Sequence, residues 1–147
     1  MKHSHAKWQR GDAGKTSFMA DTHLELIAKN VLDIAFRIHT KFGSGLLENV
    51  YKKMLYHELV KMGHKVDVEK SVSFEFEGHC YENAFRADLI IDDCFIVETK
   101  STEQMHPIYG KQLKTYLTLM DMRLGLLLNF GMASLKDGIE RVVNKYY

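Results

Sequence analysis

The sequence has little cysteine, with only Cys80 and Cys94 among its 147 residues. Two cysteines are too few for the disulfide framework that supports many small secreted proteins, and there is no pair of Cys-x-x-Cys motifs for structural zinc. Isolated thiols are typical of proteins in a reducing compartment. The cysteine content therefore excludes a disulfide scaffold and favours the cytoplasm.

Long apolar runs and a large net charge are also missing. The stretch "LGLLLNF", residues 124–130, has the length of a strand and is too short to cross a bilayer, and no signal-peptide pattern occurs. Lys and Arg number 20 and Asp and Glu 19, which gives a formal net charge of +1. This excludes the overall basic field of tail-driven nucleic-acid binders. We expect a cytoplasmic protein without a membrane role, in which any nucleic-acid contact depends on a local patch.

Residues 1–20 differ in pattern from residues 21–147. They are polar and lack a hydrophobic period, so we expect a flexible leader that need not be native sequence. Its "GDAGKT" ends like a phosphate-binding loop, but Gln9 stands where that motif requires glycine. The chain as a whole has 46% hydrophobic and 27% charged residues, and residues 21–147 suit one globular domain.

Hydrophobic periodicity predicts two helices at the start of this domain. Apolar residues recur at steps of three and four from Thr22, where Thr22 and Glu25 match a capping box, to a C-cap at Gly43. A second helix is expected over residues 46–62. The second helix has a basic face, in which Lys52, Lys53 and Lys61 could follow a nucleic-acid backbone, although a solvated face is the ordinary interpretation.

Alternating patterns then predict strands, with one more helix among them. The strands are expected at "KVDVE", at "SVSFEF", in the segment "AFRADLIIDDCFIVETK", at "LGLLLNF" and at "GIERVVN", with a turn at residues 77–79. Pro107 suits the first turn of a helix over residues 106–120. The order of elements predicts an α/β (α+β) domain with a mixed β-sheet flanked by helices.

The segment "AFRADLIIDDCFIVETK", residues 84–100, carries charges at the ends of two apolar strands. Alternation of side chains puts Arg86 and Asp88 on one face of the first strand, and Glu98 and Lys100 on one face of the second. Matching the apolar faces across an odd-numbered turn then pairs Asp88 with Glu98 and Arg86 with Lys100. Like charges on neighbouring strands destabilise a sheet, so these pairs need another reason. The apolar pairs of the same register are Ile91 with Phe95 and Leu89 with Val97.

A divalent cation between Asp88 and Glu98 would remove this repulsion, and oxygen ligands with open positions suit Mg²⁺ or Mn²⁺. The Thr99 carbonyl lies near the same edge and could be a further ligand. Lys100 could hold a water molecule or neutralise charge on a phosphorane-like transition state. The pattern therefore indicates metal-assisted hydrolysis of a phosphodiester. The competing interpretation is that Glu98 and Lys100 end a strand in solvent and pair with charges elsewhere.

Asp88 followed by Glu98-Thr99-Lys100 resembles the D…(D/E)xK signature of the PD-(D/E)XK nuclease superfamily. Ala87 occupies the proline position of the name, and Thr99 replaces a more usual aliphatic residue, which is harmless if only its carbonyl binds metal. The resemblance implies a restriction-endonuclease-like core, an active site on a β-hairpin and Mg²⁺-dependent cleavage of DNA. It also implies that Asp88 and Glu98 are metal ligands and that Lys100 is the catalytic lysine.

The stretch "GLLENVY", with Gly45, Glu48 and Tyr51, resembles the hallmark of the GxxExxY branch of that superfamily. Blocks such as "QLKTYL" and "LKDGIERVVN" follow in the family's order, and the resemblance covers residues 24–144. It implies that Glu48 is the acid which the first core helix contributes to the site. Glu48 and Tyr51 also share the helical stripe that packs inward, although an acid at a helix start is favoured by the helix dipole alone.

Gln112 and Tyr116 resemble the Gln-x-x-x-Tyr motif of exonuclease-like branches, which implies a supporting or substrate-positioning role. They lie one helical turn apart and would meet the same surface, as an ordinary surface pair also would. Arg86 could contact phosphate by a bidentate fork, or form a structural salt bridge with Glu48 or Glu69. His106, before the last helix, is interpreted as a cap and is left out of the catalytic set.

Two classes of function agree with these patterns. The first is a metal-dependent nuclease acting on DNA. The second is a non-catalytic module of the same fold that binds nucleic acid or another protein, which the modest charge favours. The sequence leaves open whether the protein works as a homodimer or as a subunit of a larger complex.

Overall fold

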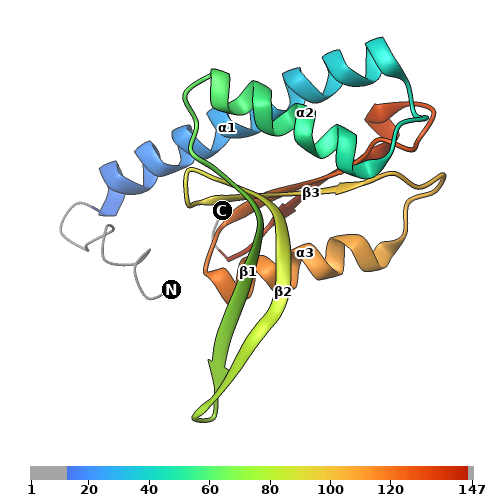
Figure 1. Ribbon diagram of the computed structural model, residues 1–147. Helices are drawn as coiled ribbons and strands as arrows, with labels where there is room; N and C mark the ends of the chain where they lie inside the picture. The colour runs from blue at the N-terminus through green and yellow to red at the C-terminus, as the bar shows by residue number, and fades with distance from the viewer. Residues whose placement is uncertain (1–12, 146–147) are drawn as a thin grey trace.

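The structure is a computed structural model that describes residues 13–145 as a five-stranded sheet with helices on both faces (Figure 1). The strands lie in chain order, and β3 runs parallel to β4 while the other neighbours are antiparallel. The predicted α/β (α+β) fold, with a mixed sheet flanked by helices, is confirmed. The elements are α1 (Ala13–Phe42), α2 (Glu48–Lys61), β1 (Val66–Phe76), β2 (His79–Ile91), β3 (Phe95–Lys100), α3 (Pro107–Met120), β4 (Leu124–Asn129), the 3₁₀ turn η3 (Leu135–Gly138) and β5 (Ile139–Val143).

The sheet separates two hydrophobic cores. Helices α1 and α2 cover one face and α3 covers the other (Figure 1). Alternate residues of β3 serve different cores, because Phe95 and Val97 pack with α1 and α2 while Ile96 packs with α3. Strand β4, which lies between β3 and β5, is buried along its whole length, which explains its continuous apolar run.

Helix α1 begins at Ala13, so the predicted start at the Thr22 capping box is wrong. Thr22 and Glu25 lie within the helix, because no proline interrupts the preceding residues and a helix former such as Ala20 continues the pattern. Of the expected leader, residues 1–12 lie outside the described residues and residues 13–20 belong to α1. The end of the helix at Gly43 agrees with expectation, since Gly43 has a φ of +72°.

Strands β1 and β2 continue beyond the sheet as a two-stranded arm, residues 72–85, which extends past α3 (Figure 1). The predicted turn lies at its tip, where Glu77 and Gly78 have φ values of +51° and +79°, as in a type I′ hairpin turn. A bulge that contains Asn83, at a φ of +51°, shifts the pairing of the two strands and bends the arm. Strand β1 joins the two segments expected as separate strands, and Glu69 lies at their junction.

The β2–β3 hairpin has the predicted register for its apolar pairs. The turn occupies residues 92–94, so the odd-numbered loop is confirmed. The side-chain pattern determines this register, because a slip by one residue would turn the apolar residues of β3 toward the wrong core. The observed pairs are Leu89 with Val97, Ile90 with Ile96 and Ile91 with Phe95.

The two strands separate after the Leu89–Val97 pair, so the predicted pairing of Arg86 with Lys100 is wrong. Arg86 lies opposite Ser71 because β2 follows β1 into the arm. Lys100 lies opposite Asn129 because β3 stays beside β4. The charged residues are therefore placed at the point where the hairpin opens.

Candidate active site

Asp88 and Glu98 converge at the opening of the β2–β3 hairpin, where each carboxylate is held by the opposite strand. The backbone N–H of Asp88 donates to Glu98 Oε1 at 3.1 Å. The backbone N–H and the hydroxyl of Thr99 donate to Asp88 Oδ2 at 2.8 and 3.0 Å. Each carboxylate therefore accepts a hydrogen bond from a backbone N–H of the other strand. The predicted direct pairing of Asp88 with Glu98 in the β-ladder is not observed.

The surroundings of the Glu98 carboxyl disfavour its ionised form. It is only 8% exposed, and burial together with the charge of Asp88 raises its pKa to about 8. The Asp88 amide and the Lys100 ammonium act in the opposite direction and are outweighed. The fold therefore keeps a proton on Glu98 at neutral pH when no further cation lies near this pair.

The oxygens of this site fit a hard divalent cation. A cation between Asp88 and Glu98 would replace the proton that burial and the charge of Asp88 retain on Glu98. Within residues 13–145 no group of three or more His, Cys, Asp and Glu side chains is arranged to bind a metal. The protein ligands would be the two carboxylates and the Thr99 carbonyl, which leaves positions for water and phosphate, as Mg²⁺ prefers.

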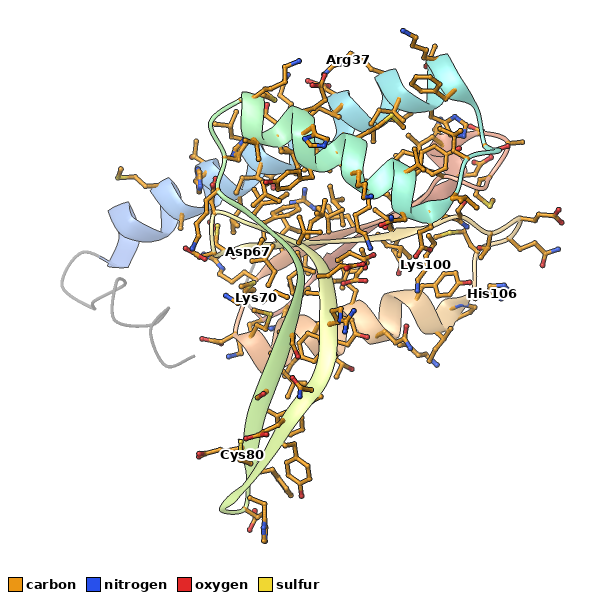
Figure 2. The ribbon with its side chains drawn as sticks, viewed as in Figure 1. Arg37, Asp67, Lys70, Cys80, Lys100 and His106 are labelled. Carbon is orange, nitrogen blue, oxygen red and sulfur yellow. The ribbon has the colours of Figure 1, made fainter. Side chains whose placement is uncertain are left out.

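Lys100 ends β3 beside both acids. Its charge lowers the pKa of the Glu98 and Glu48 carboxyls. Its ammonium lies 4.8 Å from the centre of the Tyr109 ring, and Figure 2 shows Lys100 near the start of α3, close to His106. The lysine therefore rests against the Tyr109 ring and acts electrostatically on the Glu98 and Glu48 carboxyls.

Glu48 is the first residue of α2 and faces the site. Its pKa is raised by burial and by the charge of Asp88, while Lys100, Lys52 and a hydrogen bond from the backbone N–H of Ser101 lower it. The structure therefore brings Glu48 near Asp88, while its role as an acid of the site stays a prediction.

Tyr51 explains part of the Gly-x-x-Glu-x-x-Tyr spacing. Its hydroxyl donates to the Gly43 carbonyl at 2.5 Å and accepts from the Leu46 N–H at 3.1 Å. Its ring stacks on Phe130 with the centroids 4.4 Å apart. The tyrosine thus closes the loop before α2 and fixes the start of the helix, and with it Glu48.

Lys52 belongs to the site, although the sequence placed it on the basic solvated face. It is 5% exposed, and its Nζ lies 2.7 Å from Glu69 Oε1 and 3.7 Å from Asp88 Oδ1. The signal that could have found it is its position one helical turn after Glu48, on the same face. Of the three lysines assigned to that basic face, Lys53 is exposed as expected.

Tyr116 reaches the site from α3. Its ring stacks on Phe85 with the centroids 4.0 Å apart, and burial together with Glu98 and Asp88 raises its pKa.

Gln112 lies one turn before Tyr116, on the exposed surface of α3. Arg86 is exposed on β2, and its charge contributes to lowering the pKa of Glu69, whose ion-pair partner is Lys52. Tyr116 therefore lies near Asp88 and Glu98, whereas Gln112 and Arg86 lie on the exposed surface.

Asn129 is a supporting residue that sequence reasoning missed. It is completely buried at the end of β4, and its Oδ1 accepts from the N–H groups of Thr102 and Gly131, each at 3.0 Å. Its Nδ2 donates to the Thr102 hydroxyl at 3.0 Å and to the Gln104 carbonyl at 3.2 Å. The Asn129 side chain therefore holds the loop that follows Lys100 in place.

The fold and the acidic pair together define a restriction-endonuclease-like nuclease domain. A comparison with protein families matches residues 25–142 to the PD-(D/E)XK nuclease superfamily. The chain belongs to this superfamily, which implies nuclease-type function, binding of nucleic acid and general use of divalent metals. A comparison with curated proteins finds no match, and neither does a comparison with solved structures. No helix in residues 13–145 has both the length and the apolar character needed to span a membrane.

Proposed function

We propose that this protein is a Mg²⁺- or Mn²⁺-dependent nuclease of the GxxExxY branch that hydrolyses phosphodiester bonds of DNA in the cytoplasm. The observation that carries the proposal is the interlocked pair of Asp88 and Glu98 at the opening of the β2–β3 hairpin, with Lys100 beside it. Two acids held so close in a buried position disfavour each other unless a cation joins them.

Asp88, Glu98 and the Thr99 carbonyl would hold the metal ion. When bound, the ion would place positive charge beside the scissile phosphate and lower the pKa of a water ligand. The Lys100 ammonium would orient the attacking water or neutralise the charge that develops on the phosphate oxygens. The Glu48 carboxylate would accept a hydrogen bond from a water on the α2 side of the site, because it faces Asp88.

Three further residues would position the nucleic acid. The Tyr116 ring stacks on Phe85, burial and the charges of Glu98 and Asp88 raise the pKa of its hydroxyl, and that hydroxyl can donate a hydrogen bond to a phosphate oxygen. Gln112 extends the same helix surface by one turn, where its amide can meet the next sugar or phosphate. Arg86 supplies an exposed guanidinium at the base of the arm.

The test is cleavage of plasmid and oligonucleotide DNA by purified protein with Mg²⁺, with Mn²⁺ and with a chelator. Asp88→Asn and Lys100→Met should abolish metal-dependent cleavage. Glu103→Gln is the matched control, because Glu103 is exposed in the loop after β3 and its loss should leave the rate unchanged.

Equal cleavage by the wild type and by Asp88→Asn would overturn the assignment of the active site. Binding of DNA without cleavage in any metal would favour the alternative, a non-catalytic nucleic-acid- or protein-binding module of the same fold. Metal binding separates the two further, because such a module has no need of Mn²⁺ at the acidic pair.

A further inference from the structure

We infer that Lys52 is an internal cation shared between Glu69 and Asp88, and that this sharing sets how tightly the site binds its divalent metal ion. The inference rests on the proposed function, because it concerns the same metal site. It assigns a positioning role to Lys52 and Glu69, two residues outside the D…(D/E)xK signature.

The position of the Lys52 ammonium is unusual for a lysine. A nearly buried ammonium is stable only beside opposite charge, and Lys52 finds it in Glu69 at 2.7 Å and in Asp88 at 3.7 Å. Glu48 adds a third negative charge to its surroundings, since the charges of Asp88, Glu69 and Glu48 all favour the protonated lysine. The ammonium is thus stabilised by three carboxylates, one of which, Asp88, belongs to the acidic pair.

Lys52 lies beside the Asp88 oxygen that does not accept from Thr99. Asp88 Oδ2 already accepts two hydrogen bonds from Thr99, whereas Oδ1 lies 3.7 Å from the lysine. A metal ion that bound Asp88 Oδ1 would therefore approach a positive charge. The repulsion at such separations is large enough to change metal affinity by about tenfold or more.

Glu69 gives the lysine an alternative partner. Its backbone has a φ of +51° although the ladder is regular on both sides, where Val68 pairs with Leu89 and Lys70 with Ala87. A left-handed conformation is unfavourable for a residue with a Cβ inside a strand, so the surrounding contacts hold it there. With its carboxylate hydrogen bonded to Lys52, Glu69 can keep the ammonium when a metal ion takes Asp88.

The experiment measures the dissociation constant for Mn²⁺ by calorimetry on wild-type protein and on three variants. Lys52→Gln should bind Mn²⁺ about tenfold tighter or more, because the competing charge is gone. Glu69→Gln should bind about tenfold weaker or more, because the ammonium then turns to Asp88. Lys53→Gln removes the same charge from the exposed neighbouring position and should stay within about twofold of the wild type.

The opposite signs separate this role from a structural one. General damage to the site would weaken binding in both Lys52→Gln and Glu69→Gln, and that result overturns the inference. So does equal affinity of Lys52→Gln and Lys53→Gln. If Lys52→Gln does not fold, the Mn²⁺ affinity of Glu69→Gln is the remaining test. An affinity equal to that of the wild type then overturns the inference. Failure of the wild type itself to bind Mn²⁺ would instead remove the metal site and the proposed function with it.

Discussion

Replacing Glu98 with glutamine should stabilise the metal-free protein and abolish the proposed metal-dependent cleavage. Glutamine has nearly the same shape, and its carbonyl can accept the hydrogen bond from the Asp88 N–H. Its amide also carries no charge, so it does not repel Asp88. The substitution therefore removes the electrostatic cost at this position while keeping the contact between the strands.

The size of the effect follows from the pKa of Glu98, which is about 8 in the folded protein against an ordinary value of 4.5. At pH 7 the unfolded chain carries an ionised Glu98 and the folded protein a protonated one. Holding this proton about 2.5 pH units above the ordinary pKa costs about 3 kcal/mol at 1.36 kcal/mol per unit. Removing that cost should raise the melting temperature by roughly 6–12 °C for a domain of this size.

The sign of the pH dependence is specific to a raised carboxyl pKa. Below pH 4.5 the folded and unfolded states are both protonated at Glu98, so the two proteins should be equally stable there. As the pH rises from 4.5 to about 8 the wild type should lose stability relative to the variant, and above about 8 the difference should level off.

The assay is urea unfolding between pH 5 and pH 9 with a chelator present, so that no metal ion occupies the site. Glu103→Gln serves as the control for loss of an exposed glutamate, and it should change the free energy of unfolding by less than about 0.5 kcal/mol. A Glu98→Gln protein no more stable than the wild type at pH 8 would refute the reasoning, and so would a gain that is the same at pH 5.

Other substitutions test the supporting residues and the metal. Asn129→Ala should lower the free energy of unfolding in urea by about 2 kcal/mol or more, because it leaves the buried N–H groups of Thr102 and Gly131 without their acceptor; a loss under about 0.5 kcal/mol would contradict this. Tyr51→Phe should cost about 1 kcal/mol and speed hydrogen exchange at the Leu46 amide, whereas unchanged exchange would show that the hydroxyl does not hold the loop. Saturating Mn²⁺, at about 100 times its dissociation constant, should stabilise the wild type by about 3 kcal/mol in thermal unfolding, and Asp88→Asn should show none of this gain.

The sequence by itself determined the local elements and the hairpin register. Alternation of apolar residues placed Leu89 opposite Val97, because a slip by one residue would turn the apolar residues of β3 toward the wrong core. Pro107 marked the start of α3, since proline fixes a helical φ and needs no hydrogen-bond donor in the first turn. These features depend on neighbours in the chain or on a periodicity of two or 3.6 residues, which can be read without coordinates.

The tertiary structure alone decided what lies around the acidic pair. Helical spacing puts Lys52 on the same face as Glu48, but only the packing of α2 against the sheet buried Lys52 beside Asp88 and left Lys53 exposed. Arg86 and Lys100 were expected as partners, but β2 follows β1 into the arm while β3 stays with β4. Contacts of this kind join residues far apart in the chain, so they depend on how strands twist and helices pack, which no local pattern specifies.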